Sequence, residues 1–296
     1  MRPYKVFGLV FFILLAAPSV AQAWGPMTHV KLASDLLGHL QLLPAGLAIL
    51  LARHRKDFMF GNIAADVVVA KRLSRVRQIC HHWETGFSLL EDAGESRGRA
   101  FAFGYLCHLA ADTIAHGKFI PHQMTLTRTT MSFGHLYWEM RADAALGTRY
   151  RHVLRQVLRD VAADHRASLH ACMTDTFLPF TMNWGVFYRT NRLVSRGFWR
   201  RALWQWAHLS RWHLPGQLMR EYRQESLERM VDVLANGREA AVCHEDPSGN
   251  AALAYTRIQR RQLRQMARAG LTMPHVYHEA VFPHAPRPNG QFRLPA

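Results

Sequence analysis

The sequence predicts an all-α protein whose helices form a single helical domain. Apolar residues recur at helical spacing through most of the chain between residues 24 and 270, and the Val-, Ile- and Thr-rich alternation typical of strands is scarce. Hydrophobic residues make up 49% of the chain and charged residues 20%, which excludes a disordered or fibrous protein. No internal repeat or linker divides this stretch. We therefore expect one domain over residues 24–270, followed by a Pro-rich tail over 271–296.

Local signals place the helices in order along the chain. Pro44 suits a helix start, Gly117 suits a helix end, and Pro215 separates two helical segments. The periodicity predicts helices over Met27–His39, Pro44–Arg55, Phe101–Lys118, Thr130–Ala145, Arg151–Met173, Gly197–Arg211, Gln217–Asn236 and Asn250–Ala269.

Residues 1–23 have the features of a secretory signal peptide. Arg2 and Lys5 precede an apolar run that is short for a membrane span, and Ala21-Gln22-Ala23 is a small-x-small cleavage signal. We expect cleavage between Ala23 and Trp24, which gives a secreted or periplasmic protein. An uncut membrane anchor is the alternative.

The charge and the histidine content indicate an anionic partner and a metal. The chain carries +16 with every His counted neutral, or +14 once Arg2 and Lys5 are removed, which suits nucleic acid, a phospholipid surface or a phosphorylated substrate. Its 18 His residues are unusual, because imidazole is above all a metal ligand and a proton carrier. Four cysteines (Cys80, Cys107, Cys172 and Cys243) allow one or two disulfides. They include no CxxC pair, so we expect nitrogen and oxygen ligands.

Polar side chains recur at one-turn spacing in two of the predicted helices. His108, Asp112 and His116 follow one another at four-residue intervals, and His135 and Glu139 repeat the interval on the next helix. Positions four apart lie on one face of a helix, so these groups can converge on metal ions in a helical core.

Two residues earlier in the chain fit the same site. Asp66 lies among small apolar residues, where a buried carboxylate would be costly without a cation. The run His81-His82-Trp83 supplies another imidazole.

After cleavage the chain would begin Trp24-Gly25-Pro26-Met27-Thr28-His29. This start, followed by the motifs above in the same order, resembles the zinc-dependent phospholipase C family. The family includes the related catalytic domain of glycosylphosphatidylinositol-cleaving phospholipase D. The resemblance implies three zinc ions. It implies that the Trp24 amine and carbonyl bind a zinc ion with His29 and Asp112, and that Asp112 bridges to a second ion. The implied ligands are Trp24, His29, Asp66, His82, His108, Asp112, His116, His135 and Glu139.

Two positions have alternatives, and one spacing departs from the secreted phosphatidylcholine-cleaving enzymes. His81 is an alternative to His82, and His122 to His116; we favour His82 because family members have His-Trp there. Three residues separate Asp112 from His116, where those enzymes have five. The shorter spacing is similar to the phospholipase D-type branch.

The resemblance implies a secreted zinc-dependent phosphodiesterase that hydrolyses the head-group phosphodiester of phospholipids at a membrane surface. Asp66 is the candidate general base, by analogy with the family's Asp. A zinc-dependent single-strand nuclease is the first alternative, since such nucleases share the fold and a charge of +14 attracts a polyanion. A non-catalytic periplasmic zinc- or lipid-surface-binding protein is the second. The sequence indicates no obligate protein partner.

Overall fold

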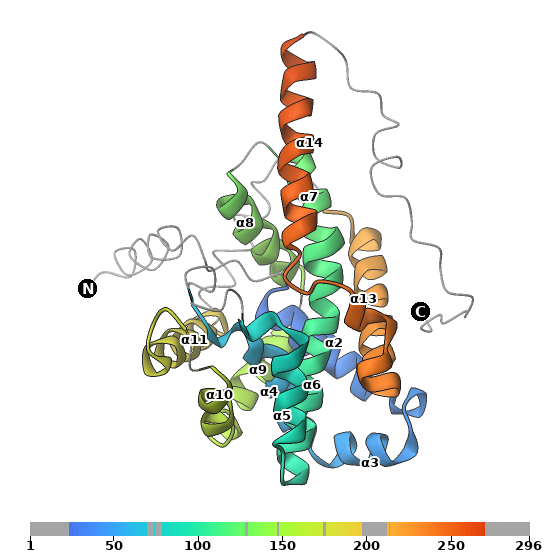
Figure 1. Cartoon of the computed structure of the whole chain (residues 1–296), viewed down its shortest axis with the longest axis vertical. Coiled ribbons are helices and arrows are strands. Elements are labelled where there is room, and N and C mark those ends of the chain that lie inside the picture. Colours follow the sequence, from blue (N-terminus) through green and yellow to red (C-terminus); the bar gives the residue numbers. More distant parts are fainter. Residues whose placement is uncertain are drawn as a thin grey trace.

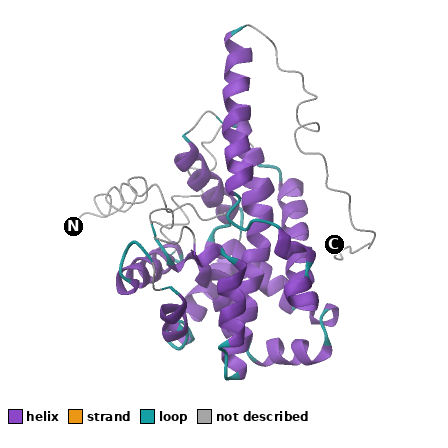
Figure 2. Cartoon of the chain, viewed as in Figure 1, coloured by secondary structure: helices purple, strands orange, loops and turns teal. Residues whose placement is uncertain are grey.

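A computed structural model describes residues 24–69, 74, 79–127, 130–146, 148–173, 176–196, 212 and 214–269. In this part of the chain the secondary structure is helical throughout, without strands (Figures 1 and 2). The all-α prediction is confirmed. The α-helices are α2 (Pro26–Leu37), α3 (Ala45–Arg53), α4 (Arg55–Ala64), α5 (Trp83–Glu91), α6 (Ser96–Ile114), α7 (Ile120–Leu126), α8 (Met131–Ala144), α9 (Thr148–Asp160), α10 (Arg166–Cys172), α11 (Phe180–Val194), α13 (Gly216–Asn236) and α14 (Asn250–Arg268).

Helix α6 forms the centre of the bundle, where it packs against α4, α5 and α13 (Figure 1). From Ala100 to Ile114 every residue except Phe103 is buried, as expected for a helix that is surrounded by the other helices of the bundle. The helical backbone continues beyond the end of α6 as a π-helical turn, Ala115–Phe119, and then as α7. Gly117 lies inside this turn, so our expectation that it ends the helix was wrong.

Two glycines allow α4 and α6 to cross closely. A Cβ added to Gly61 would lie 2.0 Å from the Phe101 carbonyl oxygen, and one added to Gly104 would lie 2.1 Å from the Phe58 carbonyl oxygen. The backbones therefore touch at this crossing. The short 3-10 turn Ala65–Val67, which carries Asp66, follows α4 directly and reaches the same face of α6.

Other differences from the predicted elements are local. The predicted helix Arg151–Met173 is two helices, α9 and α10, with a turn between them. Sequence reasoning missed α4, α5, α7 and α11. The predicted signal peptide, the predicted helix Gly197–Arg211 and the predicted Pro-rich tail lie outside the described residues. All four cysteines are described and are free thiols. Among the described helices, none combines the length and apolar character needed to span a membrane.

Candidate metal centre

Asp112 lies at the centre of a buried cluster of imidazoles and carboxylates. Its Oδ2 lies 3.3 Å from Nε2 of His108, one turn earlier on α6, and 3.7 Å from Nδ1 of His116, in the π-helical turn. Asp112 and His108 are fully buried, and His116 is 4% exposed. The predicted polar stripe therefore exists, and it faces the interior of the bundle.

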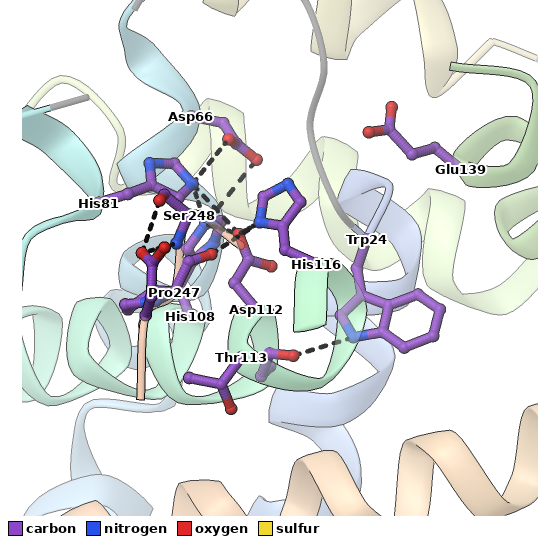
Figure 3. Close-up of polar contacts among 12 residues, drawn as sticks. Trp24, Asp66, His81, His108, Asp112, Thr113, His116, Glu139, Pro247 and Ser248 are labelled. Carbon is purple, nitrogen blue, oxygen red and sulfur yellow. Dashed lines mark hydrogen bonds and ion pairs between the residues drawn. The ribbon is translucent and has the colours of Figure 1, made fainter. Parts of the chain in front are cut away.

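Three other elements bring ligand-type groups to Asp112. Helix α2 supplies His29, whose Nε2 lies 3.3 Å from Asp112 Oδ1. The turn Ile79–His81 supplies His81, whose Nε2 lies 3.1 Å from Asp112 Oδ2 and 3.6 Å from Asp66 Oδ1. Asp66 Oδ2 lies 3.9 Å from Nε2 of His108 (Figure 3).

Electrostatics keep the central carboxylate ionised. Burial alone would raise the pKa of Asp112, but contacts from His108, His29 and His81 hold it well below its usual value. Burial and the neighbouring His108 lower the pKa of His29, so this imidazole favours its neutral form. An ionised carboxylate and a neutral imidazole are the forms that bind metals.

Backbone carbonyls orient two of the imidazoles. Nδ1 of His108 donates to the Asn62 carbonyl at 2.8 Å, and Nδ1 of His116 donates to the Pro247 carbonyl at 2.7 Å. A carbonyl can only accept, so in each neutral ring Nδ1 carries the hydrogen and Nε2 keeps its lone pair. Such contacts fix the tautomer and the ring direction of metal-binding histidines.

Gly249 allows the Pro247 loop to approach His116. It adopts φ +60°, and a Cβ there would lie 2.4 Å from the His116 Cβ. Asp246 shapes the same loop, because its carboxylate accepts from the backbone N–H groups of Ser248 and Asn250. Sequence reasoning missed this loop, although Pro247-Ser248-Gly249 is a recognisable turn signal.

His135 and Glu139 on α8 form a second group beside the first. Nε2 of His135 lies 3.2 Å from Oε1 of Glu139, and the rings of His135 and His116 are 5.2 Å apart. In Figure 3 Glu139 lies apart from Asp66 and His81. His116 therefore lies between the two groups.

Trp24 is fully buried next to the cluster. Its indole N–H donates to the Ala111 carbonyl at 3.2 Å, and its ring stacks on Phe119 with centroids 4.7 Å apart. These contacts place Trp24 beside the residue that precedes Asp112 in α6, with the indole directed away from the imidazoles (Figure 3).

The geometry favours His81 over His82 and His116 over His122. His81 is 2% exposed and contacts Asp66 and Asp112, whereas His82 is exposed and directly precedes α5. We therefore replace His82 by His81 in the candidate ligand set. His122 lies on α7 with its Nδ1 2.7 Å from the Tyr222 hydroxyl, while His116 adjoins Asp112.

A family model described as zinc dependent phospholipase C matches residues 28–185, more than half of the chain. The chain belongs to the zinc-dependent phospholipase C family. The resemblance seen in the sequence is thus confirmed, and the family is one of phosphodiester hydrolases. No curated protein and no solved structure matched the chain.

The cluster fits the zinc ion that the family requires. Two triads, His29 with Asp66 and His108, and His81 with His108 and Asp112, each offer three ligand atoms within 4.8 Å of one another. Nδ1 of His29 and Oδ1 of Asp112 are buried without a hydrogen-bond partner among the described residues. Imidazole nitrogen and carboxylate oxygen are preferred zinc ligands, and a cation would compensate these buried polar atoms.

Proposed function

We propose that this protein is a secreted zinc-dependent phosphodiesterase that hydrolyses the head-group phosphodiester of phospholipids. The observation that carries the proposal is the convergence of His29, Asp66, His81, His108 and Asp112 in one buried cluster, within a chain of this family. The ligand set would comprise these five residues with Trp24, His116, His135 and Glu139, and we propose three ions.

The reaction requires that the negative charge on the phosphoryl oxygens be neutralised, so that a nucleophile can attack phosphorus. Zinc bound by these residues would neutralise this charge, lower the pKa of a bound water toward neutrality and stabilise the departing alkoxide. The chain supplies the rigid, water-poor surroundings in which such charge interactions are strong. The full burial of His29, His108 and Asp112 provides those surroundings.

Asp66 is our candidate for the general base. Its side chain is 5% exposed, whereas those of His29, His108 and Asp112 are fully buried. A carboxylate at the solvent side of the cluster can accept a proton from the attacking water and release it to bulk solvent. The packing of the Ala65–Val67 turn against α6 holds it near the Nε2 atoms of His81 and His108.

We further propose that removal of residues 1–23 completes the site by freeing the amine of Trp24. The fully buried position of Trp24, against Ala111, supports this. A variant with one extra residue before Trp24 should bind less zinc and turn over more slowly than the chain that begins at Trp24. Equal zinc content and equal activity would contradict the maturation step.

The test uses the chain from Trp24 onward, loaded with zinc, and follows phosphorus-containing products from phosphatidylcholine vesicles and from single-stranded DNA in parallel. We expect phosphocholine release that a chelator abolishes, with the DNA intact. Cleaved DNA with intact lipid would replace the proposal with the nuclease. If zinc binds tightly and neither substrate reacts, the non-catalytic alternative holds.

A further inference from the structure

Helix α14 carries an exposed basic face that neither the metal centre nor the bundle uses. Over Asn250–Arg268 it contains five arginines and no acidic residue. Arg260 is partly buried, and its guanidinium donates to the Thr127 carbonyl at 3.0 Å, so it serves the fold. The other four are exposed: Arg257, Arg261, Arg264 and Arg268.

These four exposed arginines form one stripe. Their spacings of four, three and four residues place them within an arc of about 60° on an α-helix. Among the described residues, none of the four forms an ion pair with a carboxylate. Like charges at these spacings repel one another and destabilise a helix. An anionic surface alongside α14 would turn this repulsion into attraction.

One exposed apolar side chain flanks the stripe. Ile258 is 56% exposed and lies about 60° around the helix from Arg261. Leu253, Thr256 and Gln259 face the bundle, and Tyr255 lies on the side of the helix opposite the arginines. An aliphatic side chain beside a basic stripe gains from the acyl boundary of a bilayer. A nucleic-acid backbone offers Ile258 no comparable contact, so the face fits a membrane better than a polyanion.

Helix α14 starts close to the candidate metal centre. The helix begins directly after Gly249, which contacts His116, and it packs against α7 and the π-helical turn. Its far end extends beyond the other helices (Figure 1). Arg257 lies two turns, about 10 Å, from the start of the helix.

From these observations we propose that α14 is the docking element of this protein for bilayers that contain anionic phospholipids. The inference rests on the proposed function only in that the reaction takes place at a lipid surface. In this proposal the four exposed arginines bind the membrane and take no part in the hydrolysis.

The test compares the zinc-loaded chain from Trp24 onward with a variant that carries Arg257→Gln, Arg261→Gln, Arg264→Gln and Arg268→Gln. A matched control carries four Arg→Gln changes at exposed positions on other helices, Arg53, Arg55, Arg99 and Arg220. Binding is measured by co-sedimentation with phosphatidylcholine vesicles, with and without phosphatidylserine, at low and high salt. Hydrolysis is measured on a short-chain phosphatidylcholine kept monomeric.

We expect the α14 variant to bind phosphatidylserine-containing vesicles about tenfold more weakly or worse, and the control to bind nearly as the unmodified chain does. The binding of the unmodified chain should also weaken at high salt. Hydrolysis of the monomeric lipid should be equal in all three proteins. Equal vesicle binding by the α14 variant and the control would overturn the proposal, as would binding of single-stranded DNA in place of vesicles. Vesicle binding without hydrolysis of either lipid would refute the proposed function and leave the docking role intact.

Discussion

His81 and His82 are neighbours in the chain, yet only His81 lies in the buried cluster of the candidate metal centre. The 3-10 turn Ile79–His81 directs His81 toward Asp66 and Asp112, whereas His82 caps the start of α5 at the surface. Two adjacent imidazoles look alike in a sequence, because the direction of each depends on the local backbone. The motif order therefore located this part of the site, and only the structure distinguished the two residues.

This pair offers a matched test of the ligand assignment. His81→Ala removes an imidazole next to Asp112, so zinc content should fall and activity should drop by about 100-fold or more. His82→Ala should keep both near their normal values. Zinc analysis and phosphodiester hydrolysis on the two variants are the measurements. A larger loss in His82→Ala would restore our original choice.

At the scale of elements, the Pro247–Gly249 loop holds His116 in place from more than 130 residues away in the sequence. Gly249 and Gly237 both have positive φ, at +60° and +58°, but only Gly249 lies against His116. Replacing either by Ala should cost about 1–2 kcal/mol of stability from backbone strain. Only Gly249→Ala should also lose zinc and activity. Chemical denaturation and zinc analysis distinguish the two effects, and equal zinc content in both variants would contradict the positioning role of the loop.

The α4–α6 crossing sets the distance between Asp66 and His108. Gly61→Ala would place a methyl group against the α6 backbone and should destabilise the fold by about 1–3 kcal/mol or more. Gly185 on α11 has open space around it, so Gly185→Ala should be neutral or stabilise by up to about 1 kcal/mol. The unfolding free energies of both variants provide the test, and a neutral Gly61→Ala would exclude a tight crossing.

Periodicity predicted most of the helices around this crossing, since their apolar stripes are long. It missed α4, whose segment Phe58–Ala64 is buried on all sides and so shows no clear stripe. It also missed the continuation through Gly117, because a π-helical turn has the composition of a helix end. The carbonyls of Asn62 and Pro247 carry no sequence signal at all, since every residue has one.

At the scale of the whole molecule, Asp143 couples folding to pH. On α8 it accepts hydrogen bonds from the Met27 and Thr28 backbone N–H groups at the start of α2. Burial raises its pKa from 3.8 to about 6, although these hydrogen bonds lower it. Between these two values the folded state holds a proton that the unfolded chain has released. Stability should therefore fall as pH rises from about 4 to about 6.

The neutral variant Asp143→Asn isolates this effect. Relative to the variant, the unmodified protein should lose about 2 kcal/mol of unfolding free energy across that pH range. Urea unfolding of both zinc-free proteins at pH 4, 5 and 6 is the measurement. Parallel pH profiles would show that Asp143 keeps an ordinary pKa.

The central claim is that the buried cluster around Asp112 holds zinc. The most direct measurement is an anomalous difference map at the zinc absorption edge, from crystals of the chain that begins at Trp24. We predict peaks about 2.0–2.2 Å from Nε2 of His81 and of His108 and from a carboxylate oxygen of Asp112. Anomalous density confined to surface histidines, with none beside Asp112, would contradict the account.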